Sequence, residues 1–203
     1  GTKALLTLTG EPGKNYSTLQ KWANAAGEDS TETATLPKLG IYYDFDSSWA
    51  YTITSWDQRT GKWLYPIYML HTVYKSFFDQ NVPVKFVYDE QHLRELEWLI
   101  LPWHLLHDEA LERSLIRFVH DGGNLVVTDD LFQKNEDNVY LTSVPEIYRE
   151  ILGWQQNSFI HPQDDEANSP VIRSKAGKGS AWVLPRDTDE SGWKAFINEF
   201  ITS

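Results

Sequence analysis

Residues 97–130 carry the pattern of a strand, a helix, a double glycine and a second strand, and they end on two carboxylates. Short apolar runs at 98–101 and 125–127 predict the two strands. Asp108 is typical of a helix start, and Gly122-Gly123 is typical of a helix end. Apolar residues between them recur at the spacing of one buried helical face: Leu111, Leu115, Phe118 and Val119. The segment therefore predicts an α/β architecture in which this helix packs on a sheet.

The same alternation of strands and helices continues through the rest of the chain. Further strands are predicted at residues 4–8, 39–45, 83–88, 171–172 and 181–184, the last two joined by a turn at 175–179. Further helices are predicted at residues 16–26, 62–79 and 145–152, and a closing helix contains Trp193, Phe196, Ile197 and Phe200. Strands that alternate with helices indicate a parallel sheet with right-handed crossovers.

Three segments complete this outline. Residues 27–35 are polar and predict a linker, and the Ser-, Thr- and Trp-rich stretch after residue 45 predicts a loop. The predicted buried face of the helix at 62–79 consists of Trp63, Ile67, Leu70, Tyr74 and Phe77.

Charge and cysteine content exclude several classes of function. A formal net charge of -11, with no block of lysine and arginine to offset it, disfavours nucleic acid and membrane surfaces as partners. The chain has no cysteine, which excludes disulfides, thiolate metal sites and a cysteine nucleophile. No Gly-x-Gly-x-x-Gly follows the first strand, so no dinucleotide is expected, and no other cofactor is predicted. The compartment, cytoplasmic or exported, stays open.

Polar and aromatic residues gather where three predicted strands end. Because the carboxyl ends of parallel strands meet at one edge of a sheet, these residues are expected to lie close together. Carboxylates and flat rings together could bind a sugar, and the same oxygens could hold a divalent cation. The simpler interpretation is that the aspartates are turn and cap residues. The candidate ligand-binding residues are Asp44, Asp46, Trp49, Trp103, His104, Asp129 and Asp130.

No catalytic residue and no metal ligand is assigned from the sequence. His104 and His107 are three residues apart and do not form the His-Glu-x-x-His pattern of a helical zinc site. Gly177-Lys178-Gly179-Ser180 lacks the glycine spacing of a phosphate loop and predicts a hairpin turn instead.

Five short motifs follow one another along the chain: Gly40-Ile-Tyr-Tyr-Asp-Phe-Asp-Ser-Ser-Trp49, Asn81-Val-Pro-Val-Lys-Phe-Val87, Leu99-Ile-Leu-Pro102, Asp121-Gly-Gly-Asn-Leu-Val-Val-Thr128 and Gly177-Lys-Gly-Ser-Ala-Trp-Val183. Together they resemble the middle domain of family 42 β-galactosidases, often called the trimerisation domain. The resemblance implies a flavodoxin-like, class I glutamine amidotransferase-like three-layer sandwich with a mostly parallel sheet. Amidotransferases of this fold place a cysteine after the strand that corresponds to residues 125–127, where this chain has Thr128-Asp129-Asp130. Amidotransferase chemistry is therefore excluded.

The resemblance also implies a division of the chain and a role. Residues 1–37 resemble the exit from a catalytic barrel followed by a linker, and residues 38–203 resemble the middle domain itself. The two carboxylates of a retaining glycosidase belong to the barrel in that family, so the chain alone is not expected to be an enzyme.

The implied function is a non-catalytic assembly or support domain of a β-galactosidase-like glycoside hydrolase in carbohydrate metabolism. Its implied partners are the catalytic barrel of the parent chain, other copies of the chain, or both. The alternative is a carbohydrate-binding or hydrolytic site at the carboxyl edge of the sheet.

Overall fold

A computed structural model describes residues 12–13, 16–26, 37–54, 56–57, 62–63, 66–153 and 172–202. The chain divides into two compact units, residues 1–36 and residues 37–203. In the first unit, helix α1 (Tyr16–Ala26) has the predicted bounds and exposes Tyr16, Leu19 and Trp22 to solvent. The strand predicted at 4–8 and the linker predicted at 27–35 lie outside the described residues.

The second unit is built on a six-stranded sheet with the strand order β4-β1-β5-β6-β8-β7. Five of the strands run parallel to their neighbours, and β7 is antiparallel to β8. The mostly parallel sheet predicted from the sequence is therefore confirmed. The bounds are β1 (Leu39–Tyr42), β4 (Lys85–Val87), β5 (Trp98–Leu101), β6 (Asn124–Thr128), β7 (Ile172–Ala176) and β8 (Gly179–Leu184).

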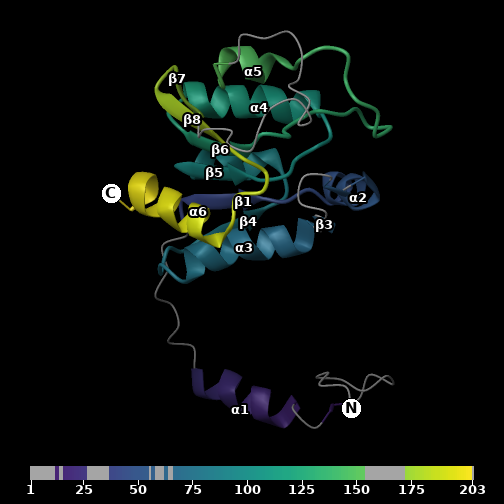
Figure 1. The fold of residues 1–203 in the computed structure, drawn as a ribbon. Helices are drawn as coiled ribbons and strands as arrows, with labels where there is room; N and C mark the ends of the chain where they lie inside the picture. The colour runs from purple at the N-terminus through teal and green to yellow at the C-terminus, as the bar shows by residue number, and fades with distance from the viewer. Residues whose placement is uncertain are drawn as a thin grey trace. The chain divides into compact units, whose positions relative to one another are not determined.

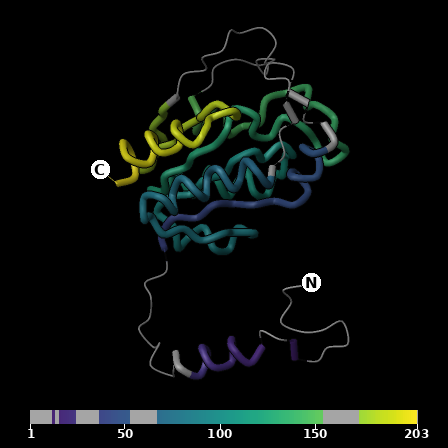
Figure 2. Tube along the Cα trace, turned by 60° about the horizontal axis from the view of Figure 1, so that its bottom comes forward, coloured from purple at the N-terminus to yellow at the C-terminus, as the bar shows by residue number. Residues whose placement is uncertain are grey.

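Helices cover both faces of this sheet and make a three-layer α/β sandwich, as predicted (Figure 1). Along β5, Leu99 and Leu101 point into one apolar core while Ile100 points into the other, which is the two-residue alternation of a strand buried on both sides. The first core includes residues of α4 (Glu109–His120), α5 (Glu146–Glu150) and the 3₁₀ helix η1 (Glu90–Glu95). The second includes residues of α2 (Phe45–Thr54), α3 (Pro66–Phe78) and α6 (Glu190–Phe196), which η2 (Ile197–Ile201) continues. Figure 2 shows α3 and the C-terminal helix side by side on their face of the sheet.

Helix α4 begins and ends where its sequence predicts. The Asp108 carboxylate accepts hydrogen bonds from the backbone N–H groups of Ala110 and Leu111, at 2.7 and 3.1 Å. Gly122 ends the helix with a φ of 119°, a backbone conformation that favours glycine. The predicted apolar residues of this helix are all buried: Leu111, Leu115, Phe118 and Val119.

The turn between β7 and β8 is the hairpin predicted from its glycines. Ala176 pairs with Gly179, so Gly177 and Lys178 form a two-residue turn, and Gly177 has a φ of 58°. A Cβ atom at Gly179 would lie 2.1 Å from the carbonyl oxygen of Gly123. The glycine therefore allows the hairpin to pack directly on the end of α4.

The sequence prediction was wrong between residues 43 and 65. The first strand ends at Tyr42, and α2 occupies most of the predicted loop, because Asp44 caps a helix there. Two short strands, β2 (Trp56–Asp57) and β3 (Lys62–Trp63), follow α2. Helix α3 starts at Pro66, four residues later than predicted, and proline is favoured at a first helical position.

The buried face of α3 also differs from the predicted one. Val73 and Phe77 are fully buried, but Ile67 is 61% exposed and Tyr74 is 38% exposed. The helix carries apolar residues on two sides, and its sequence alone does not show which side meets the sheet. Among the described residues, no helix has both the length and the apolar character needed to cross a membrane.

Candidate functional site

The carboxyl ends of β1, β5, β6 and β8 meet at one edge of the sheet, and most of the predicted site residues lie there. The backbone N–H of Trp103, after β5, donates to Thr128 Oγ1 at the end of β6, at 2.7 Å. The backbone N–H of Leu106 donates to Ser47 Oγ on α2, at 3.0 Å. The segments that follow β5 and β6, two of the three strand ends predicted from the sequence, are thus in direct contact, and α2 is joined to the loop that follows β5.

Asp130 is the most deeply buried of the candidate residues, with no exposed surface. Its Oδ1 accepts from Thr128 Oγ1 at 2.6 Å, and its Oδ2 accepts from the hydroxyl of Tyr51 on α2. Burial raises the pKa of this carboxyl to about 6, although the positive charge of Arg186 partly opposes the shift. The carboxyl links α2 to the end of β6.

Asp129 forms an ion pair with Arg186, a residue that the sequence analysis did not single out. Asp129 Oδ1 accepts from the Nε and from the backbone N–H of Arg186, at 3.0 and 3.1 Å. Burial disfavours the charge of Arg186, but Asp130 and Asp129 outweigh it and raise the pKa of the guanidinium. Arg186 follows β8, whose carboxyl end reaches the same edge. Its position after a parallel strand is the signal by which sequence reasoning could have found it.

Trp103 and Phe132 have backbone conformations that bulky side chains rarely adopt. Their φ angles are 52° and 51°, in the left-handed region. Hydrogen bonds hold both residues: Trp103 Nε1 donates to the carbonyl of Arg186 at 2.8 Å, and the N–H of Phe132 donates to the carbonyl of His104 at 2.8 Å. Trp103 is only 5% exposed, so its indole is a core side chain and does not form an open stacking surface.

The two histidines of this region have separate partners. His104 is buried, and its ring contacts Tyr42 and Phe132 edge to face, with centroids 5.7 and 5.3 Å apart. Burial lowers the pKa of His104 to about 4, so the ring is neutral at pH 7. His107 Nε2 instead lies 2.7 Å from Glu112 Oε2 on α4.

The three residues predicted at the end of β1 divide between a cap and an exposed surface. Asp44 accepts from the backbone N–H groups of Ser47 and Asp46, at 2.8 and 3.3 Å, and so caps α2. Asp46 is exposed, and Trp49, one turn further along α2, is 68% exposed. Of the seven candidate residues, Asp46 and Trp49 are the two whose side chains face solvent freely.

One small cavity lies at this edge among the described residues. A cavity lined by Asp44, Trp103, His104 and neighbouring side chains encloses about 10 Å³, which is roughly the volume needed for one water molecule. A groove of about 770 Å³ lies elsewhere, between η1 and the C-terminal half of α4, and Arg94 and Arg117 are among its lining residues. Within the described part of the chain, no group of three or more His, Asp or Glu side chains is arranged to hold a metal ion.

These contacts define the class of the domain: an α/β sandwich whose strand-end side chains bind one another. Comparisons with known proteins agree with the α/β sandwich. The sequence profile of the family described as β-galactosidase trimerisation domain matches residues 38–183. The chain therefore belongs to the β-galactosidase trimerisation domain family, and the predicted relation to a non-catalytic assembly domain of a glycoside hydrolase is confirmed.

The individual relatives are β-galactosidases. The β-galactosidase LacZ of Lactobacillus acidophilus is 23% identical, and the match covers 93% of this chain and 33% of that protein. The β-galactosidase GalA of Bacillus licheniformis is 30% identical, over 74% of this chain and 22% of that protein. The chain thus spans at most about a third of the length of these curated relatives.

Solved structures show the same fold at low sequence identity. A catalytic mutant of Gan42B, a GH42 β-galactosidase from G. stearothermophilus, has a TM-score of 0.71 at 18% identity, over 98% of this chain and 35% of that chain. The β-galactosidase from Bacillus circulans sp. alkalophilus has a TM-score of 0.72 at 18% identity, over 96% of this chain and 36% of that chain.

Proposed function

We propose that this chain is the assembly and support part of a larger glycoside hydrolase, in which it joins three copies of the parent and flanks the catalytic barrel. The family and the β-galactosidases among its relatives support this role, and they support a parent that acts on β-galactosides in carbohydrate metabolism. Residues 1–37 are the end of the barrel and a linker, and residues 38–203 are the assembly domain. The exposed apolar side chains of α1 supply a surface that the barrel would cover.

The proposed fold relationship is to flavodoxin-like and glutamine amidotransferase-like domains. Numbered along the chain, the five parallel strands stand in the order 2-1-3-4-5, which is the flavodoxin-like order. The position after β6, where amidotransferases carry their nucleophile, is occupied by Asp129 and Asp130 in a chain without cysteine. We therefore regard this domain as a member of that fold group that lacks the nucleophile.

One observation carries the proposal of a supporting role. The ionisable side chains at the carboxyl edge already have partners within the domain. Asp129 pairs with Arg186, Asp130 accepts from Tyr51, and the ring of His104 contacts that of Phe132. Because a ligand needs both free polar groups and space, the engagement of these side chains favours a structural role for them, and the cavity of about 10 Å³ lined by Asp44, Trp103 and His104 supports it.

Sedimentation equilibrium of the 203-residue chain tests the proposal. A trimer of chains of 23.5 kDa has a mass of about 70 kDa, and a concentration-dependent approach to that mass is expected. A chain that stays at 23.5 kDa at the highest accessible concentration refutes an assembly role for this domain.

Carbohydrate binding stays a second prediction. Its support is the exposed indole of Trp49 beside Asp46, because a flat ring and a carboxylate can together contact a sugar. Isothermal titration with galactose and galactosides tests it. A saturable signal that disappears in Trp49→Ala supports this second function, and the absence of a signal from the folded chain refutes it for these sugars.

A further inference from the structure

Helix α3 carries a line of side chains that are partly or largely exposed to solvent. Ile67, His71, Tyr74 and Phe78 follow one another at intervals of four, three and four residues, so they lie along one side of the helix. Ile67 is 61% exposed, Phe78 is 67% exposed, and His71 is exposed as well. We call these four residues the outer stripe. Their spacing is the one by which helices pack against other helices.

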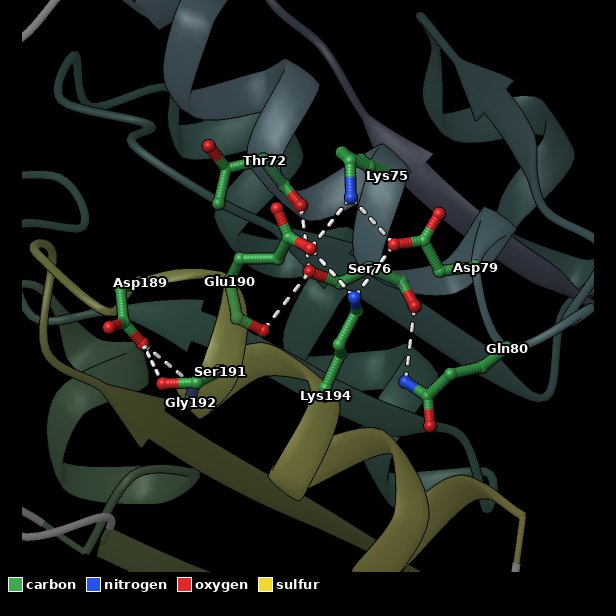
Figure 3. A network of polar contacts seen from close by, with 10 residues as sticks. All are labelled: Thr72, Lys75, Ser76, Asp79, Gln80, Asp189, Glu190, Ser191, Gly192 and Lys194. Atoms are coloured by element: carbon green, nitrogen blue, oxygen red, sulfur yellow. Dashed lines mark hydrogen bonds and ion pairs between the residues drawn. The ribbon is translucent and has the colours of Figure 1, made fainter.

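The flank of α3 next to the stripe contacts α6 through ion pairs. Lys75 and Lys194 each contact both Asp79 and Glu190, with N–O distances of 2.6 to 2.7 Å (Figure 3). The side-chain hydrogen bonds from Lys194 and Lys75 lower the pKa of Asp79 to about 2. Together with the buried inner face, this network fixes the orientation of α3, so the outer stripe is presented on a rigid element.

Aromatic stacking also orders the outer stripe before any partner binds. The ring of Tyr74 stacks on Phe78, with centroids 6.2 Å apart, and on Phe86 of β4, with centroids 5.8 Å apart. Among the described strands, β4 is the outermost on its side of the sheet. Side chains that are already ordered lose little conformational entropy on association, which favours binding.

The exposed apolar area is close to what a stable interface needs. Ile67, Tyr74, Phe78 and Phe86 are 61%, 38%, 67% and 39% exposed, which corresponds to about 400 Å² if a side chain of this size presents roughly 150 to 250 Å². A standard interface covers about 800 Å² per partner, of which roughly 450 to 520 Å² is apolar. The outer stripe with Phe86 supplies most of that amount.

Charge favours another copy of the same chain as the occupant. Copies with a net charge of -11 repel one another, so they can approach closely only through a surface poor in carboxylates. The chain has 29 acidic residues, yet the thirteen residues of α3 include no aspartate or glutamate. The carboxylates beside it, Asp79 and Glu190, are paired with Lys75 and Lys194, so the outer stripe meets this requirement.

We propose that the outer stripe of α3, with Phe86 beside it, packs against a second copy of this chain and forms the contact by which the domain assembles. This inference rests on the proposed assembly function and names the surface that carries it. The alternative occupant of this surface is the catalytic barrel of the parent chain. If the barrel covers the stripe, substitutions in the stripe should not change self-association of the 203-residue chain.

Charge substitutions in the stripe test the inference by sedimentation equilibrium. Ile67→Glu and Phe78→Glu, made separately, place a charge on side chains that are already largely exposed, so the fold should tolerate them. Each is expected to raise the dissociation constant of the assembly at least about 30-fold, as expected for a central interface residue. Val139→Glu is the matched control, because Val139 is an apolar side chain with 59% exposure on a loop outside the stripe. The dissociation constant of this variant should equal that of the unmodified chain.

The outcomes separate this inference from the proposed function. An unmodified chain that never assembles refutes both. An unmodified chain that assembles, together with stripe variants that assemble equally well, overturns the stripe alone. Hydroxyl-radical footprinting of the unmodified chain gives a second measurement that needs no variant. Tyr74 and Phe78 should become protected as concentration rises, and unchanged labelling of both in the assembled state contradicts the inference.

Discussion

Replacing Asp130 by asparagine should remove a pH dependence of folding stability that this one buried carboxyl creates. In the folded chain its pKa is raised from 3.8 to about 6 by burial, and the unfolded chain restores the ordinary value. A raised acid pKa means that the folded state binds the proton more tightly. The carboxyl therefore makes its full contribution to folding stability below about pH 4, and this contribution is lost as the pH rises through 6.

The size of the effect follows from the two pKa values. The two pKa values differ by about 2, and a difference of 1 in pKa corresponds to about 1.4 kcal/mol. The protonated carboxyl therefore contributes about 3 kcal/mol to the free energy of unfolding. The charge that acts on Asp130 is that of Arg186, which is itself paired with Asp129. The carboxyl oxygens of Asp130 accept from Thr128 and Tyr51, and Tyr148 also lies in its surroundings. The carbonyl of the Asp130→Asn side chain can still accept from Tyr51, whereas its N–H₂ group can only donate, so the hydrogen bond that Thr128 Oγ1 donates to Asp130 Oδ1 is lost. That loss is the same at every pH, so the pH-dependent part of the stability difference carries the test.

Urea unfolding at a series of pH values measures this contribution. Relative to the unmodified chain, Asp130→Asn should gain about 3 kcal/mol between about pH 4 and pH 7, and the difference should level off above that range. Asp137→Asn, on an exposed loop, controls for the loss of one negative charge. A stability difference between Asp130→Asn and the unmodified chain that does not change with pH would refute the reasoning.

Three further predictions concern the rest of the fold. Gly179→Ala should destabilise the domain by about 3 kcal/mol in urea unfolding, because its Cβ would lie 2.1 Å from the backbone oxygen of Gly123; a loss below about 1 kcal/mol contradicts the close packing. Asp108→Ala should cost about 1 kcal/mol by the same measurement, whereas Asp108→Ser, which can still cap the helix, should cost much less. A double-mutant cycle of Lys75→Met and Glu190→Gln should show favourable coupling in thermal unfolding that shrinks in high salt, and salt-independent coupling would exclude an ionic origin.

The sequence predicted best the elements whose signals are local and agree with one another. β5 and α4 combine a continuous apolar run, an aspartate cap and terminal glycines, and all of these point to the same structure. α2 was missed because its ten residues include serines, threonines and an isoleucine, which are weak helix formers, and only Ala50 and Tyr51 are buried apolar residues among those of its side chains that are described. Missing α2 also meant missing Tyr51 as the partner of Asp130.

The sequence predicted where the candidate residues lie in the fold, but not whether their side chains are buried or which partners they contact. Parallel topology brings strand ends together, and this general rule placed Trp103, Asp129 and Asp130 at one edge. No local pattern shows whether a carboxylate at a strand end faces solvent or an internal donor. Arg186 and Tyr51 lie 57 and 79 residues from their partners in the chain, and those pairings depend on the assembled fold.

Buried carboxyls with raised pKa values and left-handed backbone angles are usually taken as marks of an active site. The carboxyl edge of this domain has both, at Asp130 and at Trp103, and yet the cavity lined by Asp44, Trp103 and His104 has room for about one water molecule. Perturbed groups mark a reactive site only where a substrate atom can reach them, and here the perturbation arises from contacts that join α2 to the end of β6.

Different residues are therefore expected to determine the association of this domain and its folding stability. Asp130→Asn should change the free energy of unfolding and leave the association constant alone, whereas Phe78→Glu on the exposed side of α3 should do the reverse. If Asp130→Asn weakened association as strongly as Phe78→Glu, the edge and the stripe would belong to one coupled unit, and the assignment of recognition to α3 would fail.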